Sequence, residues 1–157
     1  MAIALFPGTF DPCTLGHLEL VRRGAALFDR LIVAVGAREE KRTLFDAATR
    51  VALFREATKG IEGVTVEAFD GLVVDFARRT GASVLLRGVR NATDYEYEAQ
   101  MAVTNARLLP GIETILLVAD PRTAFLSSSL IKEVTKAGGK IDEFVPPAVV
   151  RALANKR

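Results

Sequence analysis

Hydrophobic residues along the chain fall into two kinds of segment that alternate. Five short runs, rich in β-branched residues and apolar almost throughout, cover residues 3–6, 31–35, 64–66, 84–86 and 114–118. Continuous apolar runs of this length are typical of strands that are covered on both faces of a parallel sheet. The pattern therefore predicts five buried strands.

Longer segments with helical spacing lie between these runs. In the first of them, Leu18, Val21, Ala25 and Phe28 recur on one helical face. Further helices are predicted after a candidate N-cap at Asp46, over residues 72–79 and 94–109, after the serines at 127–129, and from Pro146 onward. Strands that alternate with helices indicate an α/β fold, a doubly wound five-stranded parallel sheet with C-terminal helices. We expect one domain over 1–157, with ligands beyond the carboxyl ends of the strands.

Composition narrows the function without identifying it. The 157 residues are 50% hydrophobic and 25% charged, which is ordinary for one globular domain in water. The net charge is only +2 and the basic residues are scattered, so we expect no nucleic-acid partner. One cysteine, Cys13, excludes an internal disulfide, and the apolar runs are too short to span a bilayer. Without a basic region before the first apolar run, a signal peptide is not indicated either, and we expect a cytoplasmic protein with no membrane partner.

The segment after the first predicted strand, residues 7–17, carries the strongest chemical signal. Gly8 and Gly16 allow tight turns and close approach of the backbone to a ligand. His17, the only histidine of the chain, falls near the first turn of a helix, where unpaired N–H groups and the helix dipole favour an anion. Position alone leaves two interpretations open, a residue that helps to cap the helix and a residue that acts on a phosphate.

The next two strands end near weaker candidates. Lys41 lies in a charged segment, residues 36–45, from which it can reach an anionic substrate as a mobile point charge, or simply face solvent. Val73 follows the third strand, where an apolar residue lines a pocket or belongs to the core.

Two arginines, Arg87 and Arg90, stand on either side of a glycine at the end of the fourth strand. A guanidinium binds phosphate through a planar fork, so the pair suggests an anion site, although ion pairs with Asp94 and Glu98 are the alternative. After the fifth strand, the three serines at 127–129 open a helix and add hydroxyl and N–H donors. Several features that suit an anion are thus expected at one edge of the sheet.

Several common catalytic signatures are missing from the sequence. It has neither a phosphate-binding P-loop nor the glycine fingerprint of dinucleotide-binding proteins. It also has no Cys/His metal cluster and no nucleophile elbow of the serine hydrolases. We therefore expect no metal ion held by protein side chains alone.

The motifs together resemble those of a known family. The first strand and helix carry Gly-Thr-Phe-Asp-Pro followed by Thr-x-Gly-His, the signature of the nucleotidyltransferases related to class I aminoacyl-tRNA synthetases. Two further motifs narrow the resemblance to the bacterial phosphopantetheine adenylyltransferases over nearly the whole chain: Arg-Gly-Val-Arg at 87–90 with Asp-x-Glu-x-Glu at 94–98, and the triple serine at 127–129.

This resemblance implies a Rossmann-like nucleotidyltransferase fold and transfer of AMP from ATP to 4′-phosphopantetheine, giving dephospho-coenzyme A and pyrophosphate in coenzyme A biosynthesis. It also implies Mg²⁺ bound with ATP, a homohexamer, and coenzyme A as a feedback ligand. The attack needs no general base, because a phosphate with a second pKa of about 6 is already ionised at neutral pH.

The resemblance also assigns residues. It gives catalytic roles to His17, as a transition-state stabiliser, and to Lys41 and Arg90. It places phosphopantetheine against Thr9, Lys41, Val73 and Arg87. It places ATP against Thr9, Phe10, His17, Gly88, Val89, Arg90, Glu98, Thr123, Ala124, Phe125, Leu126, Ser127, Ser128 and Ser129.

The chain departs from the family pattern in the loops. Thr43 stands where the family often has proline, and Thr123 and Ala124 stand where it commonly has an aromatic residue and a serine. The departures at Thr123 and Ala124 change residues that the resemblance places near the adenine of ATP. Two other functions are alternatives: a nucleotidyltransferase acting on nicotinamide mononucleotide or glycerol phosphate, and a non-catalytic module that senses ATP or coenzyme A.

Overall fold

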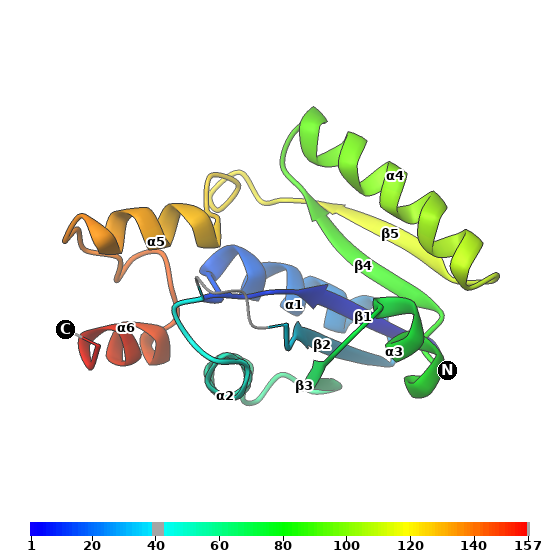
Figure 1. Cartoon of the computed structure of the whole chain (residues 1–157), viewed down its shortest axis with the longest axis horizontal. Helices are drawn as coiled ribbons and strands as arrows, with labels where there is room; N and C mark the ends of the chain where they lie inside the picture. The colour runs from blue at the N-terminus through cyan, green and yellow to red at the C-terminus, as the bar shows by residue number, and fades with distance from the viewer. Residues whose placement is uncertain (39–42, 157) are drawn as a thin grey trace.

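The computed structural model describes residues 1–38 and 43–156. Its centre is a five-stranded sheet with the strand order β3-β2-β1-β4-β5 (Figure 1). Every neighbouring pair of strands is parallel. The strands are β1 (Ile3–Gly8), β2 (Arg30–Gly36), β3 (Val64–Phe69), β4 (Val84–Val89) and β5 (Glu113–Val118). The five predicted strands and their parallel α/β arrangement are thus confirmed.

Strands β1 to β4 run further toward their carboxyl ends than the apolar runs suggested, whereas β5 ends at Val118 as predicted. Gly8, Gly36 and Phe69 are the last residues of their strands, and Arg87 lies inside β4. The expectation that Gly8 and Gly36 follow their strands is wrong, because glycine interrupts the apolar run while the parallel backbone pairing continues through it. Arg87 is consequently held by a ladder of hydrogen bonds on a rigid element.

Six helices connect and flank the strands of the described chain: α1 (Leu15–Leu27), α2 (Ala47–Ala57), α3 (Val73–Thr80), α4 (Ala92–Leu108), α5 (Ser128–Lys136) and α6 (Pro147–Ala154). The predicted N-cap Asp46 is confirmed, since its carboxylate accepts from the N–H of Thr49. Helix α4 begins at Ala92, earlier than predicted, because the Asn91 side chain caps it by accepting from the N–H of Asp94.

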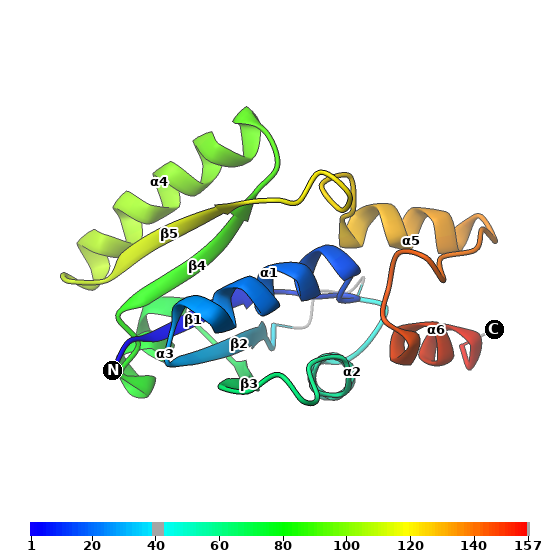
Figure 2. The same ribbon diagram turned by 180° about the vertical axis from the view of Figure 1, so that it is seen from behind.

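Alternating strand residues feed two cores, one on each face of the sheet. Ala4 and Phe6 of β1 join the larger core with side chains of α1, α2, α5 and α6. Leu5, between them in sequence, joins the smaller core with Phe76 and Ala77 of α3. Figures 1 and 2 show α3 and α1 on opposite sides of the sheet. Burial on both faces explains why the strands read as unbroken apolar runs.

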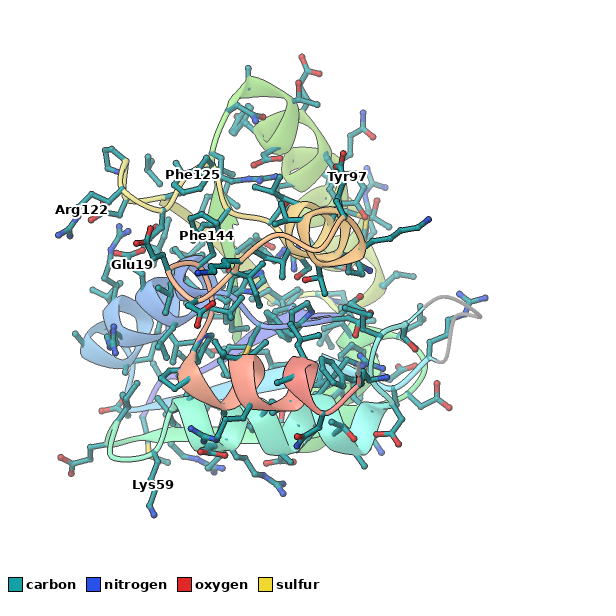
Figure 3. All side chains as sticks on the ribbon, turned by 90° about the vertical axis from the view of Figure 1, so that its left-hand side faces the viewer. Glu19, Lys59, Tyr97, Arg122, Phe125 and Phe144 are labelled. Carbon is teal, nitrogen blue, oxygen red and sulfur yellow. The ribbon has the colours of Figure 1, made fainter. Side chains whose placement is uncertain are left out.

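The two C-terminal helices lie beyond the carboxyl ends of the strands. In Figure 3, which looks onto this end of the molecule, α6 runs alongside α2. Arg151 of α6 donates to the carboxylate of Glu56 in α2, and Leu153 is buried in the larger core. No helix within the described ranges is long and apolar enough to cross a membrane.

Candidate active site

Two adjoining cavities open at the carboxyl end of the sheet. The first has a volume of about 310 Å³ and the second about 250 Å³. They share a wall made of Pro7, Gly8 and Thr9 from the end of β1, Arg87 from β4 and Glu98 from α4. The strand order turns back between β1 and β4, because β2 and β3 lie to one side of β1 and β4 and β5 to the other. Ligands of open α/β sheets bind at such a switch point.

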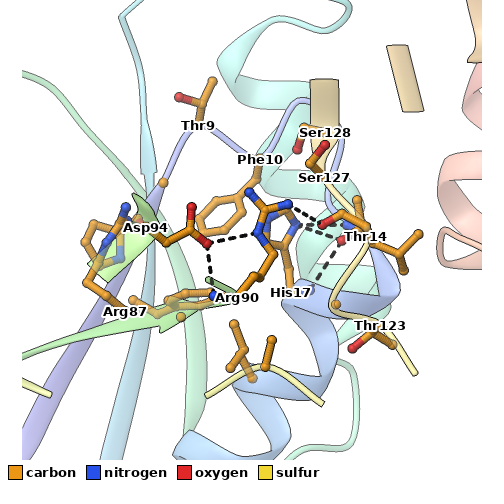
Figure 4. Close-up of a pocket in the computed structure, with 18 of the residues that line it drawn as sticks. Thr9, Phe10, Thr14, His17, Arg87, Arg90, Asp94, Thr123, Ser127 and Ser128 are labelled. Atoms are coloured by element: carbon orange, nitrogen blue, oxygen red, sulfur yellow. Dashed lines mark hydrogen bonds and ion pairs between the residues drawn. The ribbon is translucent and has the colours of Figure 1, made fainter. Parts of the chain in front are cut away.

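His17 lines the first cavity from the first turn of α1 (Figure 4). The backbone N–H of Thr14 donates to His17 Nδ1 at 3.0 Å, and the N–H of His17 donates to Thr14 Oγ1 at 3.3 Å. This reciprocal capping confirms the structural interpretation of His17. It also fixes the chemistry, because an Nδ1 that accepts carries no hydrogen, so the proton of the neutral ring lies on Nε2.

The surroundings of His17 keep its ring neutral. Burial lowers the pKa of His17 to about 4, with further lowering by the positive charges of Arg87 and Arg90. An ordinary histidine has a pKa of about 6.5. At neutral pH the side chain is therefore an uncharged hydrogen-bond donor at the wall of the cavity.

Phe10 holds the imidazole from the side. Its ring meets His17 edge-on, with the ring centroids 4.9 Å apart. Phe10 has a φ of 51°, a left-handed conformation that is costly for an aromatic residue. A Cβ at Gly8 would come within 2.8 Å of the Phe10 ring. Gly8 therefore leaves room for the ring that orients His17.

Both arginines of the Arg-Gly-Val-Arg motif are ion-paired. Arg87 donates through Nε and Nη2 to Glu98, whose side chain is only 7% exposed, and through Nη1 to the carbonyl of Pro7. Arg90 donates through Nε to Asp94 at 3.1 Å and through Nη1 to the carbonyl of Leu126. The ion pairs expected as the alternative interpretation are thus present. Since a guanidinium has five N–H donors, each arginine keeps at least two for an anion.

The serines at the start of α5 have different surroundings. Ser127 caps the helix, because its Oγ accepts from the N–H of Leu130, and the Ser128 hydroxyl donates to the carbonyl of Pro12 at 2.8 Å. Both residues line the first cavity, whereas Ser129 is exposed and does not. Ser127 keeps its hydroxyl hydrogen for a ligand, and the helix start keeps backbone N–H groups that favour an anion.

The second cavity is more apolar, and sequence reasoning missed most of its lining. Phe69, Val73 and Leu85 lie beside residues of one α4 face, namely Tyr97, Glu98, Met101, Ala102 and Asn105. Asn105, in the last turn of α4, is buried, which is unusual for an amide side chain. The spacing of Glu98, Met101, Ala102 and Asn105 is that of a single helical face. Two polar residues on an inward face were the signal that could have revealed this site.

The structure gathers most of the predicted site residues at these cavities. The first cavity is lined by Thr9, Phe10, His17, Gly88, Arg90, Glu98, Thr123, Leu126, Ser127 and Ser128, and the second by Thr9, Val73 and Arg87. Val89, Ala124, Phe125 and Ser129 line neither of the two. Phe125 is 56% exposed and its ring meets that of Phe144 edge-on, as Figure 3 shows at this end of the molecule. Lys41 and its role lie outside the described residues.

The described residues do not form a ready metal site. They include no group of three or more His, Cys, Asp or Glu side chains that is suited to an ion. The carboxylates of the first cavity, Asp94 and Glu98, already accept from arginines. A magnesium ion held by one or two carboxylates needs further ligands from a substrate phosphate. These donors do not fit an ion held by the protein alone.

Comparison with known proteins agrees with the motifs. The family described as cytidylyltransferase-like matches residues 5–134. A phosphopantetheine adenylyltransferase of Caldanaerobacter subterraneus subsp. tengcongensis is 47% identical over 99% of this chain and 98% of its own. One from Alkalilimnicola ehrlichii is 51% identical over 98% and 90%, and one from Synechocystis is 47% identical over 98% and 96%.

Proposed function

The chain belongs to the cytidylyltransferase-like family and, within it, to the phosphopantetheine adenylyltransferases, and from this membership we propose how its site moves AMP from ATP to 4′-phosphopantetheine. The observation that carries the proposal is the shared wall between the two cavities. Arg87 and Thr9 face both cavities, so groups bound on either side meet at this wall. A transfer between two phosphates requires such a meeting point.

The first cavity suits the nucleotide. Its anion-binding elements are the starts of α1 and α5 and the unused N–H groups of Arg90. The second cavity suits the pantetheine arm, which is apolar with two amides. Phe69, Val73 and Met101 supply apolar contacts there, and the buried side chain of Asn105 supplies amide donors and acceptors.

The reaction is an in-line attack at the α-phosphorus of ATP. A phosphate oxygen of phosphopantetheine forms the new P–O bond, and the bond from the α-phosphorus to the bridging oxygen breaks, so that pyrophosphate leaves with that oxygen. The acceptor phosphate is already ionised at neutral pH, so no base is required. Positioning and neutralisation of charge are the work left to the protein.

His17 stabilises the transition state in this mechanism. The cap occupies Nδ1 and leaves the Nε2–H of this cavity-lining residue to donate to the α-phosphate oxygens as negative charge grows on them. Arg87 holds the acceptor phosphate at the shared wall, and Arg90 with Ser127 holds the departing pyrophosphate. Loss of one preorganised donor typically costs about 100- to 1000-fold in turnover.

Magnesium enters the proposal as a partner of the nucleotide. It neutralises phosphate charge when it is bound with ATP, and the protein contributes no complete set of ligands. Coenzyme A is the proposed feedback ligand, since it carries both an adenosine group and a pantetheine arm and so suits both cavities. A cytoplasmic location, where thiols stay reduced, is compatible with the single buried Cys13.

A homohexamer is the proposed assembly. Its support is the apolar surface of α4 and β5, where Val103 and Val118 are exposed. β5 is the edge strand of the sheet on this side, and an exposed strand edge favours association with another chain.

The test is release of pyrophosphate from ATP and Mg²⁺, with and without 4′-phosphopantetheine, by the wild-type chain and His17→Ala. We expect release that depends on phosphopantetheine, and turnover lower by about 100-fold or more in the variant. Release with nicotinamide mononucleotide or glycerol phosphate instead would indicate a different transferase. ATP binding without any release would indicate a sensor.

A further inference from the structure

Arg50 of α2 is one of the most deeply buried side chains of the protein, at 1% exposure. Its Nη1 donates to the carbonyls of Thr9 at 2.7 Å and of Gly36 at 2.8 Å, and its Nε donates to the carbonyl of Phe45 at 3.1 Å. Nη2 has no partner among the described residues. Buried charges are normally paired with an opposite charge, so a buried guanidinium whose partners among the described residues are all carbonyls calls for an explanation.

The carbonyls that share Nη1 belong to two walls of one cavity. Thr9 follows the end of β1, Gly36 is the last residue of β2, and both line the second cavity. The pairing of the two strands ends at Gly8 and Val35, so Thr9 and Gly36 lie just beyond the last paired residues. Arg50 bridges them there and so sets the distance between the two walls.

The same helix also holds Phe10. The Thr9 carbonyl is part of the peptide that enters Phe10, which has the costly φ of 51°. Phe54, one turn after Arg50, meets the Phe10 ring edge-on with centroids 4.8 Å apart. Helix α2 thus fixes both the backbone and the ring of the segment between the two cavities.

We propose that Arg50 is a positioning residue for the acceptor site, whose forked guanidinium holds the Thr9 and Gly36 backbones at the spacing that phosphopantetheine needs. The proposal rests on the proposed function of the second cavity. Because Gly36 lines the second cavity and not the first, the loss should fall on phosphopantetheine more than on ATP.

A rival explanation is that the positive charge of Arg50 alone attracts the anionic acceptor. The two explanations differ in what lysine does at this position. Lysine keeps the charge but has a single nitrogen at its end and cannot bond three carbonyls as a planar fork does. Methionine removes both the charge and the fork at similar size.

The experiment compares Arg50→Lys and Arg50→Met with Arg55→Met as the matched control. Arg55 lies in the same helix and also donates to a backbone carbonyl, that of Val66, at 3.1 and 2.9 Å, but Val66 lines neither cavity. KM for each substrate and kcat are measured by pyrophosphate release, at a temperature well below the thermal unfolding of every variant.

We expect the KM for phosphopantetheine to rise about tenfold in both Arg50 variants, as the loss of charge-assisted hydrogen bonds predicts, with the KM for ATP within about twofold. Arg55→Met should leave both KM values near wild type. Equal effects on the two substrates, or a wild-type KM for phosphopantetheine in Arg50→Lys, would overturn the proposal. If Arg50→Met does not fold, the KM of Arg50→Lys for phosphopantetheine decides between the two explanations. A wild-type chain that releases no pyrophosphate would contradict the proposed function instead.

Discussion

His17 shows how one side chain can have a structural and a chemical role together. Its Nδ1 completes the cap of α1 by accepting from the N–H of Thr14, and this bond is what directs the remaining proton to Nε2. Burial and the two neighbouring arginines lower its pKa to about 4. The capping and catalytic interpretations, which sequence position left open, are therefore compatible, and the cap supplies the tautomer that the proposed catalysis needs.

The first prediction concerns the protonation of His17. The sole histidine gives a single pair of imidazole signals, Hε1 and Hδ2, in a proton NMR titration, and Hε1 is the one followed. We expect this signal to keep its neutral chemical shift down to pH 5.5, because the pKa in the folded protein is about 4. A titration midpoint near pH 6.5 would contradict the burial of His17 beside Arg87 and Arg90.

The lowered pKa of His17 also makes the free energy of unfolding depend on pH. Between pH 6.5 and 4 the unfolded chain binds a proton at His17 that the folded chain does not, so the free energy of unfolding falls as the pH falls through this window. The part of the free energy of unfolding that depends on an uncharged His17 is therefore fully present above pH 6.5. Urea unfolding of wild type and His17→Gln at pH 7 and 5 measures it as the difference between the two pH dependences.

Arg87 and Glu98 form a pair in which neither partner can be removed alone without cost. Glu98 is almost wholly buried and accepts from two nitrogens of Arg87, while the third nitrogen reaches Pro7. Glu98 therefore orients the guanidinium at the shared wall of the two cavities. This role differs from the direct contact with ATP that the family resemblance implies, and the two are compatible because Glu98 lines both cavities.

The second prediction follows from this pair. Arg87→Met leaves a buried carboxylate without its partner and should lower the free energy of unfolding by about 2–4 kcal/mol. Adding Glu98→Gln should restore much of the stability but not the affinity for phosphopantetheine. Urea unfolding and KM values for both substrates measure this.

The exposed ion pair of Arg78 with Asp75 provides the control. Its side chains are 57% and 58% exposed, so Arg78→Met should cost less than about 1 kcal/mol. If Arg78→Met and Arg87→Met lowered the free energy of unfolding equally, burial of Glu98 would not be the reason for the cost at Arg87.

At the scale of elements, two helix starts converge on the first cavity. α1 brings His17 and α5 brings Ser127 and Ser128, while the Ser128 hydroxyl ties the two starts together through the Pro12 carbonyl. The Thr123 carbonyl lies 3.4 Å from where a Cβ at Gly16 would stand, so the loop before α5 packs directly against the start of α1. The proposed anion site is therefore built by this pair of helix ends and depends on their contact.

The third prediction separates the members of the triple serine. Ser127→Ala removes the N-cap of α5, which typically costs about 1 kcal/mol, so thermal stability should fall. It also removes a hydroxyl from the first cavity, so the affinity for ATP should fall as well. Ser129→Ala, at an exposed position outside the cavity, should change neither. Thermal unfolding and the KM for ATP are the measurements. Equal effects of the two substitutions would contradict the assignment.

At the scale of the whole molecule, α4 is unusual because its two buried residues are polar while its outward face is partly apolar. Glu98 and Asn105 are the buried residues, whereas Val103 and Leu108 are exposed. The inward polar residues belong to the cavities. The outward apolar residues and the uncovered edge of β5 are the surface that supports the proposed homohexamer.

The fourth prediction tests that surface. Val118, at the end of β5, is 70% exposed in a single chain. Sedimentation velocity should show a species of six times 17.0 kDa for the wild type and smaller species for Val118→Lys. Leu27→Lys, at a residue of α1 that is 60% exposed, is the control and should sediment as wild type. A monomeric wild type would contradict the proposal.

Much of the fold followed from local pattern. The five strands, the Asp46 cap and the position of His17 in a first helical turn depend on residues within a few positions of one another, and all are confirmed. The ends of β1 to β4 were predicted too early, because the apolar pattern stops before the backbone pairing does. The departures at Thr123 and Ala124 proved unequal: Thr123 lines the first cavity, and Ala124 does not.

What the sequence determined by itself was the type of chemistry, a site for phosphates at one edge of a parallel sheet, since apolar periodicity, glycines and helix caps act over short distances along the chain. Only the tertiary structure decided which side chains meet there. It paired Arg87 with Glu98, built the second cavity on one face of α4, and placed Arg50 beneath the backbone of Thr9, 41 positions away. Such contacts depend on how whole helices and strands pack, so they cannot be predicted from residues that are close together in the sequence.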